Sequence, residues 1–151
     1  MSESKKNKEE IGSDFEKSSV SSSLGVIKEN NSFNSNNLSK PSKQQIIKQA
    51  FQFHSKGKIL EAAKLYQYFI NQGFNDHRVF SNFGIILKDL GKLKEAEVSF
   101  RKAIEIKPDY AQAYFNLGNI MKDLRKLKEA EVSFSKAIEI KPDFSDAYFN
   151  L

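Results

Sequence analysis

One stretch of the chain occurs twice at a fixed offset, and this repetition constrains the fold more than any other feature. Residues 77–110 and 111–144 align without a gap and share 23 identical residues in 34 positions. The run from Asp89 to Phe100 returns as Asp123 to Phe134, with Arg125 as the only replacement. Self-similarity at a period of roughly 20–50 residues is typical of solenoids, in which each repeat packs on its neighbours.

The apolar residues within each repeat recur at three- and four-residue spacing, which predicts two amphipathic helices per repeat. Gly57 and Gly91 lie 34 residues apart in the expected turns between paired helices, where a left-handed backbone favours glycine. Arg125 takes the equivalent place in the third pair and is expected to cost up to about 1 kcal/mol relative to glycine. Helical periodicity begins at Lys43, after Pro41.

The second helix of each later repeat is expected to end at a proline. Pro108 and Pro142 occupy equivalent positions, and proline cannot continue a helix interior. The aspartates that follow, Asp109 and Asp143, are expected to cap the next helices through their side chains. Gln112, three residues after Asp109, is expected to close a capping box with it.

These patterns divide the chain into a tail and an array. Residues 1–42 contain 12 serines and 6 asparagines and no sustained apolar period, so we predict a disordered tail. The repeats are then predicted at residues 43–76 (divergent), 77–110 and 111–144, with the first helix of a fourth at 145–151. The incomplete fourth repeat is expected to leave Tyr148, Phe149 and Leu151 poorly covered.

Small residues recur where paired helices must approach closely, and they carry a family resemblance. Ala50, Gly84 and Gly118 share one position of the repeat. The sequence resembles the tetratricopeptide repeat family, whose pattern W-x2-L-G-x2-Y…A-x3-F…P is met in the third repeat. The matching residues are Tyr114, Leu117, Gly118, Met121, Ala130, Phe134 and Pro142. The resemblance implies an all-α solenoid: a right-handed superhelix of antiparallel helix pairs, with about three repeats and the start of a fourth.

The composition argues against several classes of function. The chain has no cysteine, no apolar run that could span a membrane, and two histidines, His54 and His77, without metal-ligand spacing. It contains no phosphate-binding loop or nucleophile motif, so we predict no enzyme activity, no cofactor and no metal. The predicted location is the cytoplasm, without membrane association.

The charge pattern indicates a solvated helix surface. The formal net charge is +5, but basic and acidic residues are mixed along the repeats. Glu97–Arg101, Lys102–Glu105 and Lys136–Glu139 have the spacing of helical ion pairs. We therefore predict no nucleic-acid partner.

Asparagine recurs at 34-residue intervals in the first helices, as Asn82, Asn116 and Asn150. An amide offers donors and an acceptor, which suits it to hold a peptide backbone. The family architecture implies that first helices line a concave face. Its polar residues would be Asn82, Lys88, Asp89, Gln112, Asn116, Asn119, Lys122, Asp123 and Asn150. The other interpretation is a surface residue copied by duplication.

Two particular binding modes known in the family bear on this face. The asparagine series, with Asn116-Leu117-Gly118-Asn119, is similar to the repeats of O-linked N-acetylglucosamine transferase-like bacterial proteins, which implies binding of extended peptides. A carboxylate clamp is disfavoured, because Ile47 and Phe51 occupy the matching positions of the first repeat.

Three functional hypotheses follow from the sequence. The leading one is a non-enzymatic interaction module that binds a protein or peptide partner in its concave groove. The second is the targeting part of a larger glycosyl-, sulfo- or methyltransferase. The third is a scaffold that forms homo-oligomers through its uncovered C-terminal end.

Overall fold

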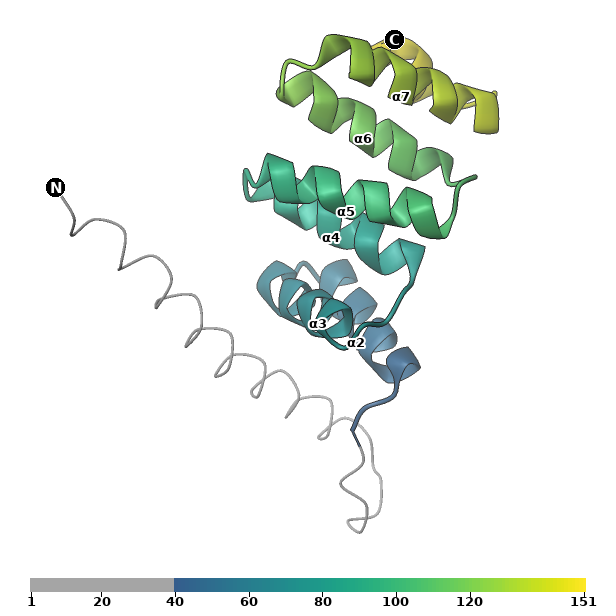
Figure 1. Ribbon diagram of the computed structural model, residues 1–151. Coiled ribbons are helices and arrows are strands. Elements are labelled where there is room, and N and C mark those ends of the chain that lie inside the picture. The colour runs from purple at the N-terminus through teal and green to yellow at the C-terminus, as the bar shows by residue number, and fades with distance from the viewer. Residues whose placement is uncertain (1–39) are drawn as a thin grey trace, which may run out of the picture. The chain divides into compact units, whose positions relative to one another are not determined.

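The computed structural model describes residues 40–151, and in this range it contains seven α-helices and no strand. The chain divides into two compact units between Phe74 and Asn75 (Figure 1), and each unit is described by itself. The tail predicted to be disordered, residues 1–42, lies outside the described residues except for Lys40, Pro41 and Ser42.

The first unit is a pair of helices, α2 (Lys43–Ser55) and α3 (Ile59–Asn71), which pack on each other. A capping box fixes the start of α2, because Ser42 Oγ accepts from the amide of Gln45 at 3.3 Å and Gln45 Oε1 accepts from the amide of Ser42 at 2.7 Å. The pair buries apolar and aromatic side chains, chiefly Ile46, Ala50, Leu65, Tyr66 and Phe69. The predicted helical start at Lys43 is confirmed.

The second unit contains five helices that follow one another in the stack (Figure 1). They are α4 (His77–Asp89), α5 (Leu93–Ile106), α6 (Ala111–Asp123), α7 (Leu127–Ile140) and the short α8 (Ser145–Asn150). The most extensive packing lies within the pairs α4–α5 and α6–α7, and α5–α6 and α7–α8 join successive pairs. Because successive pairs pack on each other within this unit, the predicted all-α solenoid is confirmed.

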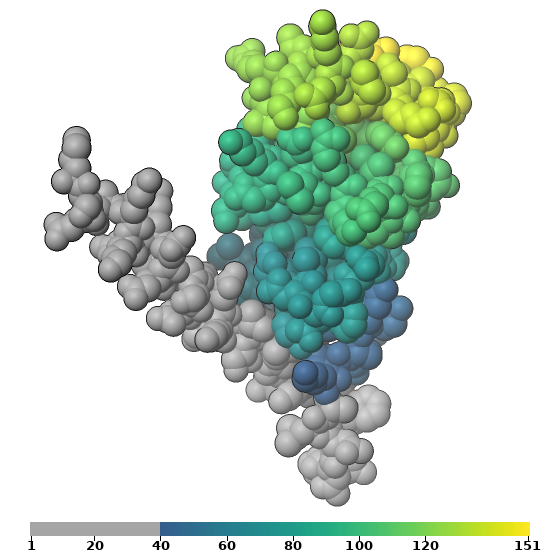
Figure 2. Space-filling model, viewed as in Figure 1, coloured from purple at the N-terminus to yellow at the C-terminus, as the bar shows by residue number. Residues whose placement is uncertain are grey.

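Glycines allow the paired helices of the second unit to approach closely. A Cβ atom on Gly84 would lie 2.8 Å from Cε1 of Phe100, and one on Gly118 would lie 2.5 Å from Cε1 of Phe134. Both phenylalanines are almost fully buried. The missing side chain therefore leaves room for the ring of the partner helix. Figure 2 shows one outer face of this unit, in teal to yellow.

The turns between paired helices have the left-handed residue that the sequence predicts. Gly57 and Gly91 have φ values of 71° and 72°, and Arg125 has a φ of 61°. In the last turn the amide of Arg125 donates to the carbonyl of Lys122, and the amide of Lys126 donates to that of Met121. These bonds satisfy carbonyl groups at the end of α6. Arg125 thus adopts a backbone conformation that costs a non-glycine residue free energy.

The predicted aspartate caps are wrong. The N-cap residue of α6 is Tyr110 and that of α8 is Phe144, and neither helix has a side-chain cap. Packing explains the difference, because Phe144 is buried against Phe115 with ring centroids 4.9 Å apart, and Tyr110 meets the ring of His77 at the same distance. The aromatic residue that follows each aspartate is thereby drawn into the cap position.

None of the helices in residues 40–151 is both long enough and apolar enough to cross a bilayer.

Candidate functional site

All nine predicted site residues lie on α4, α6 and α8, the first helices of the repeats in the second unit. These helices are neighbours, because α4 contacts α6 and a hydrogen bond joins α6 to α8. By helix, the residues are Asn82, Lys88 and Asp89 on α4; Gln112, Asn116, Asn119, Lys122 and Asp123 on α6; and Asn150 on α8.

The three asparagines of the series are each half-buried. Asn82 and Asn116 lie directly before Phe83 and Leu117, which pack in the core, so their amides lie at its edge. Asn150 precedes Leu151, which is exposed. Asn119 is also half-buried, whereas the remaining five predicted residues are exposed.

Lys122 and Asn150 come together across two helices. The Nζ atom of Lys122 donates a 2.8 Å hydrogen bond to Oδ1 of Asn150, and Nδ2 of Asn150 donates to the carbonyl of Asp146 at 2.8 Å. Both polar atoms of the Asn150 side chain are therefore already engaged. The Lys122 ammonium has further donors, so it can still bind an acceptor from outside the chain.

Asn116 has an unmatched hydrogen-bond donor. Its Oδ1 accepts from Nε2 of Gln112 at 3.3 Å, while its Nδ2 is buried and has no partner among residues 40–151. An unsatisfied buried donor costs about 1–3 kcal/mol. The exposed Gln112 side chain lies beside this amide. A peptide amide that displaced Gln112 would donate to Oδ1 of Asn116 in its place, and a half-turn of the Asn116 side-chain amide would present Nδ2 to a peptide carbonyl on that side.

The structure does not join the other predicted residues to one another. Within the described part of the chain, the side chains of Asn82, Lys88, Asp89, Asn119 and Asp123 form no hydrogen bond or ion pair. Their polar atoms are consequently available to solvent or to a ligand.

An open hollow of about 490 Å³ lies at the C-terminal end of α6. Lys122, Asp123, Arg125 and Leu127 line it, and Leu127 is 63% exposed. The hollow combines an apolar side chain with two cations and one carboxylate. Sequence reasoning missed Arg125 and Leu127 as possible site residues, although the replacement of glycine by arginine in the turn was a visible signal.

The histidines serve packing. Nδ1 of His54 lies 3.2 Å from the hydroxyl of Tyr66, and the ring of His77 meets Tyr110 edge-on. Burial lowers the pKa of His77, and this effect outweighs the opposing charge of Asp76. In the range that the structure describes, no three His, Cys, Asp or Glu side chains group in a way that could hold a metal ion.

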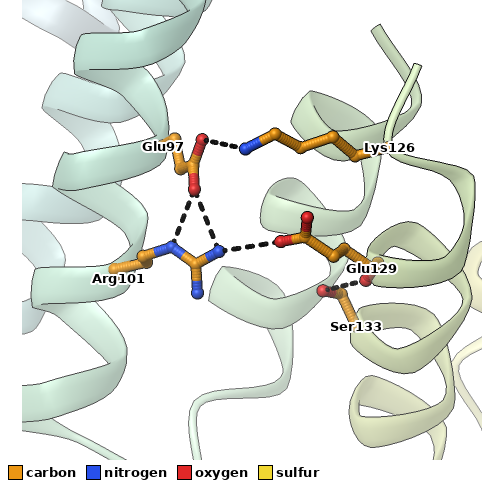
Figure 3. Close-up of polar contacts among 5 residues, drawn as sticks. All are labelled: Glu97, Arg101, Lys126, Glu129 and Ser133. Carbon is orange, nitrogen blue, oxygen red and sulfur yellow. Dashed lines mark hydrogen bonds and ion pairs between the residues drawn. The ribbon is translucent and has the colours of Figure 1, made fainter. Parts of the chain in front are cut away.

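A network of ion pairs links the second helices α5 and α7 (Figure 3). Arg101 pairs with Glu97 of its own helix at 2.9 Å and with Glu129 of α7 at 3.3 Å, while Lys126 pairs with Glu97 at 3.4 Å. Burial raises the pKa of Glu97, but the hydrogen bonds and charges of Arg101 and Lys126 more than offset this and lower it overall. Successive repeats are thus tied together by charge as well as by packing.

The predicted helical ion pairs are confirmed. Glu97 and Arg101 form the pair already described, and Lys102 with Glu105 and Lys136 with Glu139 form pairs at 2.7 Å. All three pairs lie on second helices, and each has at least one well-exposed partner. Individual ion pairs that are exposed in this way contribute little to stability.

The stacked helix pairs, the 34-residue period and the polar first helices define a helical repeat protein. Family models identify the kind of repeat: residues 84–125 match the model described as TPR repeat, and residues 111–144 match that described as tetratricopeptide repeat. The chain is a tetratricopeptide repeat protein. No curated protein matches it, so the particular resemblance to O-linked N-acetylglucosamine transferases stays a prediction.

Solved structures with the same fold agree with this assignment. The second TPR domain of the human RPAP3 protein, in complex with the HSP70 peptide SGPTIEEVD, is 25% identical; the match covers 70% of this chain and 88% of that one, with a TM-score of 0.64. The first TPR of Spaghetti (RPAP3) bound to the HSP90 peptide SRMEEVD is 22% identical, with coverages of 72% and 86% and a TM-score of 0.67. MamA is 19% identical, with coverages of 87% and 71% and a TM-score of 0.72.

Proposed function

We propose that this chain is a protein-interaction module and that the first helices of its second unit bind an extended peptide of a partner. The observation that carries the proposal is the buried, unpaired Nδ2 of Asn116. A peptide carbonyl is the most abundant acceptor that a partner chain can offer, and pairing with it would remove the cost of the unmatched donor.

The chemistry of neighbouring side chains supports a peptide ligand. Asn82 and Asn119 add amides that can donate and accept, and Lys122 adds a cation beside Asn150. Contacts to backbone groups give affinity with little dependence on sequence. The hollow lined by Lys122, Arg125 and Leu127 could take one side chain of the peptide and so provide a preference.

The structural relatives support the same class of ligand. The two RPAP3 domains were solved with peptides of HSP70 and HSP90, and the second of these domains is 25% identical to this chain. The identity of the partner peptide is a separate matter, since the fold supports many different ligands.

The test is a selection of peptides of about twelve residues from a random library, followed by titration of the selected peptides. We expect Asn82→Ala/Asn116→Ala to weaken binding, while Ser135→Ala, an exposed change on α7, leaves it unchanged. Equal affinity for all three proteins would contradict the role of the asparagines.

Self-association is a second candidate, because apolar side chains are exposed around α8. Tyr148, Phe149 and Leu151 are 54%, 91% and 57% exposed. Light scattering at high micromolar concentration tests this candidate, and a monomer would remove it. The transferase alternative, the cytoplasmic location and the absence of enzyme activity stay predictions.

A further inference from the structure

The excess positive charge of the repeats lies in the first helix pair, which contains none of the nine residues of the proposed peptide face. Residues 43–74 contain five lysines and one glutamate, a net charge of +4. Residues 75–151 contain 13 basic and 12 acidic residues, a net charge of +1. Ion pairs such as Arg101–Glu97 balance the second unit, whereas Glu61 is the only carboxylate available within the first pair.

One exposed side of α2 carries this charge. Lys48, Gln52 and Lys56 follow one another at four-residue spacing, so they lie on the same side of the helix, and Ser55 lies beside them. All four are exposed, and α2 contains no acidic residue. The exposed Lys58 continues this surface into the turn. We call these five residues the α2 surface.

The lysines of the α2 surface are available to a partner. The ammonium groups of Lys48 and Lys56 form no hydrogen bond or ion pair with another residue of the described range. The ammonium of Lys58 lies 5.7 Å from the centroid of the Phe53 ring, which holds it at the turn while leaving its donors accessible. Uncompensated like charges attract an anionic partner and raise its association rate.

We propose that the α2 surface binds an acidic segment of a polypeptide. At about 1.5 Å per residue, Lys48 and Lys56 are separated by about 12 Å along the helix. An extended peptide advances about 3.4 Å per residue, so carboxylates three or four residues apart match this separation. Gln52 and Ser55 lie between the two cations. The Gln52 amide can donate to and accept from the peptide backbone, whereas Ser55 Oγ, which donates to the carbonyl of Gln52, can only accept.

A polypeptide fits this surface better than a nucleic acid. Residues 43–74 contain no arginine, the residue that binds phosphate in a bidentate manner. In the first unit, as far as the structure describes it, no aromatic ring is highly exposed for stacking on bases. This inference concerns the other unit of the chain and does not rest on the asparagine face.

The test uses two labelled peptides of about twelve residues, one with Glu at every fourth position in a Gly/Ser background and one with Gln at those positions. Lys48→Gln/Lys56→Gln/Lys58→Gln removes the three charges of the α2 surface. Lys92→Gln/Lys94→Gln/Lys128→Gln removes three equally exposed lysines of the second unit and is the matched control.

We expect the Glu peptide to bind the full chain more tightly than the Gln peptide. The α2-surface variant should weaken its binding on the order of tenfold, and the control variant less than twofold. Raising the salt concentration should weaken binding of the Glu peptide to the wild type. The α2-surface variant should lose little further affinity at high salt. Asn116→Ala should have no effect in this assay, which separates the inference from the proposed function.

Three outcomes would overturn the inference. They are equal affinity for the Glu and Gln peptides, equal weakening by the two lysine variants, and tighter binding of a single-stranded DNA of the same charge than of the Glu peptide.

Discussion

Phe134 packs against Gly118 so closely that its Cε1 atom lies 2.5 Å from the position of a Cβ on the glycine. The ring is 1% exposed and belongs to a buried cluster with Leu117, Ile120 and Met121. Because the cluster surrounds it, the ring has little room to move. This contact sets how closely α6 and α7 approach, and Gly84 with Phe100 repeats it one pair earlier at 2.8 Å.

Gly118→Ala should therefore destabilise the protein although alanine favours helix. Overpacking a core costs about 1–3 kcal/mol, which exceeds the gain of about 1 kcal/mol in helix propensity. Urea denaturation should show a lower free energy of unfolding for Gly118→Ala. Gly84→Ala should lower the free energy of unfolding by less, because a Cβ at Gly84 would lie farther from the ring of the partner helix. A stabilised Gly118→Ala protein would show that the ring moves aside freely.

Two buried serines at equivalent positions should differ in their contributions to stability. Ser99 Oγ donates a 2.8 Å hydrogen bond to the carbonyl of Phe80 in the neighbouring helix, whereas Ser133 Oγ bonds to Glu129 of its own helix. We expect Ser99→Ala to lower the free energy of unfolding by about 1 kcal/mol. Ser133→Ala should change it by less than about 0.5 kcal/mol. If both substitutions lowered the free energy of unfolding equally, the hydrogen bond from Ser99 to Phe80 of the neighbouring helix would contribute no extra stability.

Arg125→Gly should stabilise the protein. The arginine has a φ of 61°, a region that glycine adopts without a steric penalty. The expected gain in the free energy of unfolding is up to about 1 kcal/mol, measured by urea or thermal denaturation. Arg125→Ala keeps the Cβ atom and serves as the control, with no gain expected. If Arg125→Ala stabilised the protein as much as Arg125→Gly, the positive φ would not be the cause of the gain.

Glu97→Gln should destabilise the protein at neutral pH and much less in acid. Arg101 and Lys126 lower the pKa of Glu97 below its usual 4.5, so the ionised form stabilises the native state. This contribution, about 0.5–1 kcal/mol, is fully present above pH 4.5 and is lost as the pH falls through the lowered pKa. Denaturation of both proteins at several pH values measures it.

Glu131→Gln is the matched control for this prediction. Glu131 occupies the equivalent position of the next repeat and forms no ion pair with a described residue. Its substitution should change stability little at any pH. The wild type and Glu97→Gln should differ in their free energy of unfolding at pH 7 and much less in acid. If this difference stayed constant into acid, the role of the ionised Glu97 would be contradicted.

The repeat period was enough to predict the helix pairs, because small residues and prolines recur at fixed positions. Gly118 predicts close helix packing, and Gly91 predicts the left-handed turn that Arg125 also adopts. The cap at Asp109 could not be predicted in this way, since packing of the neighbouring Tyr110 ring decided which residue precedes the helix. Local capping rules do not include such contacts between repeats.

The candidate site was only partly accessible to sequence reasoning. The 34-residue interval brought Asn116 and Asn150 to attention, but their partners depend on side-chain conformations across a helix pair. The bond from Lys122 to Asn150 and the unpaired Nδ2 of Asn116 are therefore structural findings. Likewise, the positive charge looked evenly mixed over residues 43–151 until the two units were counted separately.

The central claim is that Asn116 binds a peptide backbone, and calorimetric titration of a selected peptide tests it most directly. We expect Asn116→Ala to weaken binding about two- to twelvefold, the effect of one hydrogen bond of about 0.5–1.5 kcal/mol, with Ser135→Ala unchanged. An Asn116→Ala protein that is folded and binds the peptide as tightly as the wild type would contradict the claim.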